Sequence, residues 1–218
     1  MLAWLGLLLC APTHALGSER RHGFDVTLDA TAGYILYQVR RTQQYAEGNR
    51  FARLDVDTQE HSTMFGGDAR VGYKLVFSPR VALTPLIDLN YSRGRTQTRY
   101  YDTKTFSYAW QATPAVFSML LGAEVLLRDE LIGLRMAVGG GTLKLDSGQT
   151  AQGGPALLFA GRLRLPLDGA FSASLGLGAE LLRLSPLGLS PAGPPEQAVR
   201  GFLQIGIEFD GCYERRPS

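Results

Sequence analysis

Residues 171–181 of this 218-residue chain read Phe-Ser-Ala-Ser-Leu-Gly-Leu-Gly-Ala-Glu-Leu. Every odd-numbered position in this stretch is apolar, whereas the even-numbered positions hold serine, glycine and one glutamate. A period of two residues is typical of a β-strand, because successive side chains of a strand point to opposite faces of the sheet. One face of this strand is therefore apolar, and the other is small, polar and charged.

The same two-residue period returns along most of the chain. Long segments with apolar residues at i, i+3, i+4 and i+7 are missing, which argues against amphipathic helices. The 26 glycines agree with this, because glycine inside a helix costs about 1 kcal/mol relative to alanine. The sequence therefore predicts an all-β protein with eight strands, near residues 24–39, 64–77, 81–93, 107–127, 131–145, 155–166, 170–184 and 199–209.

The connections between these strands alternate strictly between long and short. In an antiparallel up-and-down barrel, this order places the long loops at one end and the tight turns with both termini at the other. Transmembrane β-barrels have this asymmetry. The sequence thus predicts an eight-stranded antiparallel up-and-down transmembrane β-barrel. The long links are residues 40–63, 94–106, 146–154 and 185–198, and the tight turns are residues 78–80, 128–130 and 167–169.

Two kinds of barrel differ in which face of the strands meets water. A soluble ligand-carrying barrel, the main rival fold, directs its apolar face inward, whereas a membrane barrel directs it outward to lipid. Here the polar face is rich in glycine and serine, which suits a narrow, crowded axis, and we expect the apolar face to contact lipid. Twelve charged residues then line the lumen: Asp25, Asp29, Asp68, Arg70, Lys74, Asp88, Glu124, Arg135, Arg162, Arg164, Glu180 and Glu208.

The signs of these charges nearly balance. Five bases face five acids on the second to eighth strands, and the first strand adds Asp25 and Asp29. An unpaired charge is costly in a narrow, poorly hydrated channel, and eight strands enclose little more than side-chain volume. We therefore expect ion pairs that close the lumen, with a narrow ion path as the alternative.

Two prolines interrupt the pattern. In the fourth strand, the apolar face changes from even to odd positions between Ala112 and Phe117, and a β-bulge near Pro114 would restore it. Pro85 removes one backbone hydrogen bond in an apolar medium, where an orphaned carbonyl costs several kcal/mol. We expect a local bulge or a water molecule on the lumen side of Pro85.

The chain resembles the OmpA-type family of small eight-stranded outer-membrane barrels, with OmpX-like proteins as relatives. The resemblance covers residues 23–209 and rests on the eight alternations, the loop asymmetry and the last strand, Phe202-Leu-Gln-Ile-Gly-Ile-Glu-Phe209. It implies a monomer in the outer membrane of a Gram-negative bacterium, with periplasmic termini. It also implies that barrel-assembly machinery reads Leu203, Ile205, Ile207 and Phe209. Many such barrels stop at the aromatic residue, whereas this chain continues to residue 218.

The ends of the chain suggest export. Residues 2–12 form an apolar run too short to span a bilayer as a helix, and small residues near Ala15 fit a signal-peptidase site. We expect a signal peptide at 1–15, a lead at 16–22, the barrel at 23–209 and a periplasmic tail at 210–218. A lipoprotein signal ending at Cys10 or a buried N-terminal segment are the alternatives. Signal removal leaves only Cys212, which excludes an internal disulfide and a thiolate zinc site.

Basic residues gather near the long-loop end of the predicted barrel. Tyr34, Tyr37, Tyr91, Tyr108 and Trp110 lie near the same end and fit an interfacial aromatic girdle. Guanidinium groups match phosphate geometry, so this rim could contact lipopolysaccharide. Acids in the loops favour the alternative of a solvated surface. The rim arginines are Arg40, Arg41, Arg93, Arg95 and Arg99.

Catalysis, metals and nucleic acid find little support. Some outer-membrane barrels modify lipid A with serine, histidine and an acid, but only Glu60-His61-Ser62 offers that set here. Neighbouring strand residues point to opposite faces, so these three do not cooperate in this way. We expect no enzyme, cofactor or metal, and a net charge of +2 does not favour nucleic acid. The leading hypothesis is a structural or interaction barrel, followed by a narrow channel and a lipid A-modifying enzyme.

Overall fold

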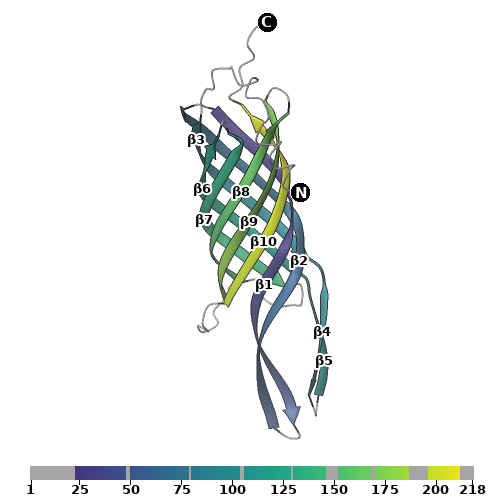
Figure 1. Cartoon of the computed structure of the whole chain (residues 1–218). Coiled ribbons are helices and arrows are strands. Elements are labelled where there is room, and N and C mark those ends of the chain that lie inside the picture. The colour runs from purple at the N-terminus through teal and green to yellow at the C-terminus, as the bar shows by residue number, and fades with distance from the viewer. Residues whose placement is uncertain are drawn as a thin grey trace.

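The computed structural model describes residues 23–47, 50–78, 80–103, 106–128, 130–145, 152–167, 170–186 and 196–211. Ten antiparallel strands make up nearly all of these residues (Figure 1). Within them, we find no helix with the length and hydropathy needed to cross a membrane. The strands are β1 (Gly23–Glu47), β2 (Arg50–Ser78), β3 (Val81–Gly94), β4 (Gln97–Thr103), β5 (Phe106–Ala112), β6 (Pro114–Leu127), β7 (Ile132–Leu145), β8 (Gln152–Pro166), β9 (Phe171–Pro186) and β10 (Glu196–Asp210).

Eight of these strands close into a barrel in the order β1-β10-β9-β8-β7-β6-β3-β2, and β4 and β5 form a separate two-stranded sheet. Closure comes from the pairing of β1 with β10, from Asp25 opposite Asp210 to Tyr37 opposite Ala198. The predicted all-β fold of eight antiparallel barrel strands is confirmed.

The first long link is not a loop but a continuation of its two strands. β1 and β2 stay paired from Gly23 opposite Lys74 to Glu47 opposite Arg50, well beyond the last pair of β1 with β10. The sequence explains this length, because neither 34–47 nor 50–63 contains a glycine or a proline that would end a strand. A two-stranded hairpin therefore projects from the barrel, as Figure 1 shows at the lower end.

The predicted fourth strand at 107–127 is wrong, because Thr113 divides it. β5 leaves the barrel and pairs with β4, with Tyr101 opposite Tyr108, whereas Pro114 starts β6, where its missing N–H does no harm. The bulge expected near Pro114 is therefore wrong too. The break between the two strands accounts for the change of parity. The β4–β5 hairpin projects from the same end of the barrel as the β1–β2 hairpin (Figure 1).

The bulge expected at Pro85 is also misplaced. β3 pairs with β6 through Pro85 opposite Ala123 without a register change. On the other side, the register between β2 and β3 shifts only between Val76 and Ser78, several residues from the proline.

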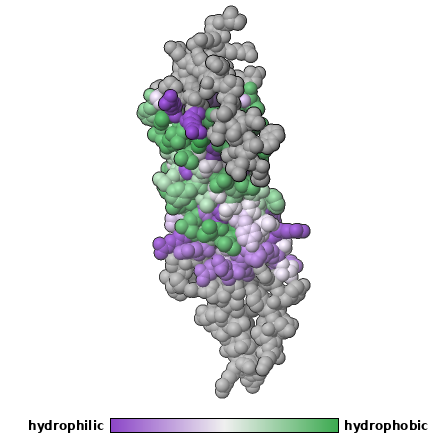
Figure 2. All heavy atoms as spheres, in the orientation of Figure 1, coloured by the Kyte–Doolittle hydropathy of each residue, from purple (hydrophilic) through white to green (hydrophobic). Residues whose placement is uncertain are grey.

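The two faces of the barrel wall point as the alternation predicts. Large apolar side chains on all eight strands are exposed on the outside, among them Leu28 (64%), Leu177 (66%) and Leu203 (63%). Figure 2 shows them as green areas across the visible face of the barrel, with hydrophilic residues below them. The charged residues are buried instead. The barrel wall is thus apolar outside, and the twelve predicted lumen charges lie inside.

Candidate functional site

The structure brings all twelve predicted lumen charges together inside the barrel. None of them is more than 5% exposed. Their positions follow from strand parity, since inward side chains take odd numbers on β1 and β7 and even numbers on the other six barrel strands. Charged groups so deeply buried require partners, because desolvation costs several kcal/mol for each ion.

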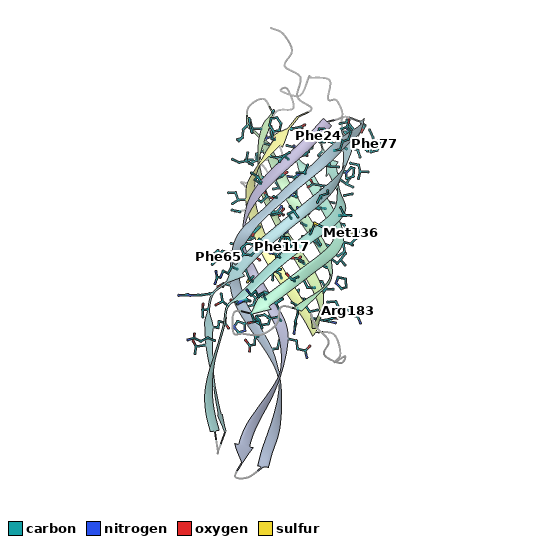
Figure 3. The ribbon with its side chains drawn as sticks, turned by 180° about the vertical axis from the view of Figure 1, so that it is seen from behind. Phe24, Phe65, Phe77, Phe117, Met136 and Arg183 are labelled. Atoms are coloured by element: carbon teal, nitrogen blue, oxygen red, sulfur yellow. The ribbon has the colours of Figure 1, made fainter. Side chains whose placement is uncertain are left out.

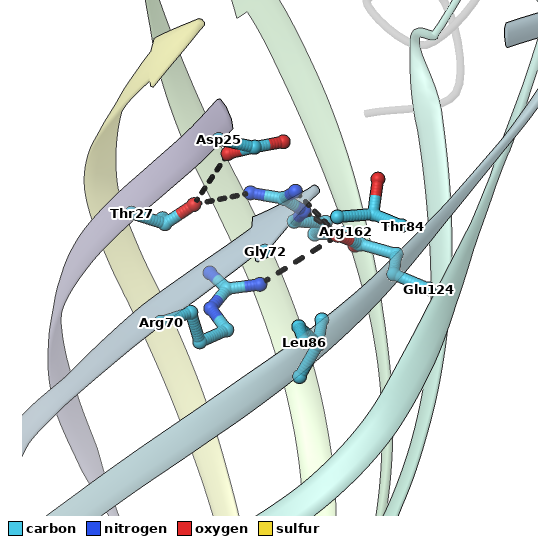
Figure 4. A pocket seen from close by; sticks show the side chains of 8 residues that line it. All are labelled: Asp25, Thr27, Arg70, Gly72, Thr84, Leu86, Glu124 and Arg162. Atoms are coloured by element: carbon cyan, nitrogen blue, oxygen red, sulfur yellow. Dashed lines mark hydrogen bonds and ion pairs between the residues drawn. The ribbon is translucent and has the colours of Figure 1, made fainter. Parts of the chain in front are cut away.

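Glu124 and Arg162 form the centre of the network. The Arg162 guanidinium donates from Nε to Oε1 and from Nη2 to Oε2 of Glu124, both at 2.5 Å, which is the bidentate geometry that makes such pairs strong. Its Nη1 also lies 2.5 Å from Glu208 Oε2. Arg70 lies 3.9 Å from Glu124 (Figure 4). It also pairs with Asp29. One carboxylate thus joins two arginines.

Two further arginines extend the network toward the projecting hairpins. Arg135 lies 3.1 Å from Asp68 and 3.0 Å from Asp88. Arg200, which the sequence analysis missed, lies 2.7 Å from Glu180 and 4.9 Å from the centre of the Phe202 ring. Parity could have found it, because it has the same even-numbered register on β10 as the predicted lumen residue Glu208.

A turn residue closes the network at the short-turn end. Glu130 lies 2.9 Å from Lys74 and 2.9 Å from Arg164, and both bases also pair with acids of β10. Glu130 adopts the left-handed backbone region with φ of 67°, which is uncommon outside glycine. Strand alternation could not reveal this residue, because a turn has no two-residue period.

The other half of the lumen is mostly apolar around the Arg200–Glu180 pair, which the sequence analysis did not predict. These inward positions were hidden by neighbours that are also apolar, such as Leu120 beside Leu121 and Leu158 beside Leu157. When both faces of a strand are apolar, alternation cannot assign either face. The buried apolar cluster comprises Ile35, Tyr37, Met64, Val116, Leu120, Ala137, Leu143, Leu145, Ala156, Leu158, Leu182, Leu184, Ala198 and Phe202.

A small cavity remains within the charged half. Its volume is about 10 Å³, which is room for one water molecule. Asp25, Arg70, Glu124 and Arg162 line it together with uncharged residues of β1, β2 and β3 (Figure 4).

The five rim arginines do not form one cluster. Arg93 and Arg95 are exposed where β3 ends. Arg40 and Arg41 lie on the projecting β1–β2 hairpin, opposite Asp57 and Val56, and Arg99 lies on the β4–β5 hairpin opposite Trp110. The side chains of these last three arginines fall outside the described ones.

Two exposed bases near the rim were missed, Lys144 on β7 and Arg183 on β9. Arg183 is exposed on β9 and lies near the end of the barrel from which the hairpins project (Figure 3). Its odd-numbered position, shared with the outward Leu177 and Leu181, is the signal that could have revealed it.

The aromatic girdle differs in part from the prediction. Tyr34 and Tyr91 are exposed on the outer face, but Tyr37 is 1% exposed and its hydroxyl donates to Glu60 at 3.3 Å. Tyr37 has inward parity on β1, so its place in the girdle was wrong. Tyr108 and Trp110 lie on β5, outside the barrel. Phe65 and Phe117 are exposed at the same level of the wall in Figure 3.

The residues weighed for catalysis lie on both sides of the wall. Glu60 and Ser62 are buried, whereas His61 is exposed and stacks on Tyr34 with ring centroids 5.4 Å apart. The three side chains therefore do not converge. In the part of the chain that the structure describes, no group of three histidine, cysteine or carboxylate side chains could hold a metal ion.

Of the remaining predicted segments, the assembly-signal strand lies within the described residues. Leu203, Ile205, Ile207 and Phe209 are exposed on β10, which pairs with both β1 and β9. Their reading by assembly machinery stays a prediction. The signal peptide, the lead at 16–22 and Cys212 lie outside the described residues.

An antiparallel barrel with charges inside and apolar side chains outside has the architecture of small transmembrane β-barrels. No family model matches this chain, and no curated protein does. Among solved structures, it is similar to outer-membrane barrels.

One of them is the attachment invasion locus protein Ail of Yersinia pestis, solved with the heparin analogue sucrose octasulfate, with 12% identity and a TM-score of 0.42 over 84% of this chain and 99% of that one. Neisserial surface protein A has 11% identity and a TM-score of 0.42 over 87% and 99%. The outer membrane protease OmpT of Escherichia coli has 10% identity and a TM-score of 0.42 over 86% of this chain and 96% of that one. The likeness concerns the fold alone.

Proposed function

We propose that the protein is an integral β-barrel of a Gram-negative outer membrane, with a closed lumen and a loop end that contacts lipopolysaccharide or other cell-surface molecules. The observation that carries the proposal is the inverted distribution of side chains. A soluble barrel would not bury ionised side chains while exposing leucine and phenylalanine around its whole wall, because water favours the opposite arrangement. Hydrocarbon outside the barrel removes this conflict.

The height of the apolar face supports membrane insertion. On β10, the outward positions from Val199 to Phe209 are all apolar or glycine, and a tilted transmembrane strand needs roughly 9–11 residues. Aromatic rings border this band at the short-turn end, where Phe24 and Tyr73 lie 5.5 Å apart edge to face and Phe171 and Phe209 lie 5.4 Å apart. Such rings suit the boundary between hydrocarbon and headgroups.

Two consecutive seals support a closed lumen rather than a channel. The charged half is crossed by ion pairs such as Arg162 with Glu124, which an ion would have to separate in order to pass. The other half is mostly apolar, and its buried Arg200 is already paired with Glu180 at 2.7 Å, so a passing ion finds little there in exchange for its hydration shell. The cavity between the charged side chains has a volume of only about 10 Å³, which is room for one water molecule.

The loop end is the proposed interaction surface. Arg93, Arg95 and Arg183 are exposed near that end of the barrel, and guanidinium groups bind phosphate with two parallel hydrogen bonds. Both hairpins project from the same end. The proposal orients this end outward and the termini toward the periplasm, and it assigns no catalytic activity. Replacing His61 by alanine should then leave lipid A composition unchanged.

Planar-bilayer conductance tests the closed lumen. The protein is extracted in detergent, its folded form is verified by gel mobility, and it is inserted into a bilayer of outer-membrane lipids. We expect no stepwise conductance above that of empty detergent. Reproducible unitary steps would instead support the narrow channel, and their loss in Leu182→Arg, which adds a charge to the apolar half, would locate the path.

A further inference from the structure

The wall of the barrel has a local break beside Pro85. Pairing between β2 and β3 reaches Gly72 opposite Leu86 and resumes at Leu75 opposite Leu83 in the same register. The two positions between them, which face Pro85 and Thr84, do not pair. Proline has no N–H to donate, so a ladder hydrogen bond is missing here. On its other side, β3 pairs with β6 without interruption.

Solvation of this break can come only from inside the barrel. Pro85 is exposed on the outer face, and under the proposed function that face meets hydrocarbon, which offers no hydrogen bonds. The cavity of about 10 Å³ lies on the lumen side of the same place. Gly72 and Leu86 from the edges of the break line it, as does Thr84 from within it (Figure 4).

Two buried polar atoms of the cavity wall call for a ligand. Asp25 Oδ2 and Thr84 Oγ1 have no hydrogen-bond partner among the described residues, although their side chains belong to residues only 4% and 2% exposed. Such groups are normally satisfied, and a polar cavity of this size holds a water molecule that bonds two to four of them. The residues that line it carry no net formal charge, with two acids against two arginines, which favours a neutral ligand over an ion.

We propose that this cavity binds one structural water molecule, which bridges Asp25 and Thr84 and hydrates the break in the wall behind Pro85. The inference rests on the proposed lipid contact of the outer face. Gly72 keeps the site open, because a Cβ there would lie 2.5 Å from Thr84 Cγ2 and 2.9 Å from the Pro85 carbonyl oxygen. A larger residue at position 72 would therefore fill the space of the water.

The test is detection of the water in the folded protein in detergent micelles. We expect a long-lived water to give nuclear Overhauser effects to the Thr84 methyl group and the Gly72 α-protons. Thr84→Val, which removes the hydroxyl at constant shape, and Gly72→Ala should abolish both. Thr31→Val is the matched control, because the Thr31 hydroxyl is also buried without a partner but does not line the cavity; it should leave the effects unchanged.

Two results would overturn the proposal. One is a wild-type protein without these effects, a measurement that does not depend on whether any variant folds. The other is an anomalous-scattering peak in the cavity of crystals soaked in rubidium, which would identify a cation site. A protein that does not enter membranes would instead contradict the proposed function. That result does not depend on whether the water is detected.

Discussion

Glu124 accepts two hydrogen bonds from Arg162 and lies 3.9 Å from Arg70, at a depth where solvent cannot replace a lost partner. Removal of one member of a buried ion pair leaves the other charge uncompensated, at a cost of about 3–5 kcal/mol. We therefore predict that Glu124→Gln lowers the free energy of unfolding by about that amount, measured by urea titration of the barrel in lipid vesicles.

The double variant Glu124→Gln/Arg162→Gln serves as the control for this prediction. If the two side chains act as a pair, the double variant loses less stability than the two single variants together, by about 1–3 kcal/mol. Additive losses, or a loss below about 1 kcal/mol for Glu124→Gln, would contradict the ion-pair account of the lumen.

Two glycines of β10 differ sharply in what surrounds them. A Cβ at Gly206 would overlap the Asp29 carboxylate and the Leu28 carbonyl oxygen, whereas a Cβ at Gly201 would meet nothing within 4 Å. We predict that Gly206→Ala destabilises the barrel by about 2–3 kcal/mol through overpacking, and that Gly201→Ala changes stability by less than about 0.5 kcal/mol. Equal urea midpoints for the two variants would argue against the close contact of β1 with β10.

At the scale of the strand, arginine substitutions on the outer face of β10 test whether this face contacts hydrocarbon. Ile205 is 64% exposed in the middle of the apolar face, and Gln197 is exposed on the same face at the loop end. Arginine at the midplane of a bilayer costs about 2–4 kcal/mol and near the interface about 0–1 kcal/mol. Ile205→Arg should therefore lower the unfolding free energy in vesicles much more than Gln197→Arg. Similar effects at both positions would place Ile205 outside hydrocarbon.

The β4–β5 hairpin should be dispensable for the barrel. It pairs only within itself, and the Thr96 and Thr113 hydroxyls that flank it lie 2.7 Å apart, so the chain can be joined between these residues. Deletion of residues 97–112 should leave the unfolding midpoint within about 0.5 kcal/mol of the full chain. A protein that no longer folds would show that the hairpin contributes to closure.

Strand alternation predicted the barrel well because the two faces of each strand differ from each other in polarity along most of the strand. It failed where that difference ends. Leu120–Leu121 and Leu157–Leu158 are apolar on both faces, so the apolar half of the lumen stayed hidden. Glu130 lies in a turn, and the long pairing of β1 with β2 beyond Tyr37 depends on the absence of strand-ending residues rather than on a polarity pattern. Ion pairs such as that of Arg162 with Glu124 form only because the register of the strands brings the two residues together. No local sequence pattern encodes that register.

The whole molecule combines an apolar outer wall, a lumen filled from both halves and two hairpins that project from one end. Pairing of each barrel strand with two neighbours leaves the closed wall without a free edge, whereas the projecting hairpins pair only within themselves. The proposed function assigns interaction with partners to the loop end, where the two hairpins lie and near which Arg93 and Arg183 are exposed.

Heat modifiability of the protein in fractionated cell envelopes tests the central claim most directly. A closed barrel resists sodium dodecyl sulfate until it is boiled, so the unboiled sample should migrate faster than the boiled one, and it should do so in the outer-membrane fraction. A protein that is recovered in the soluble periplasmic fraction, with the same mobility before and after boiling, would contradict the membrane barrel and with it the assignment of the apolar face to lipid.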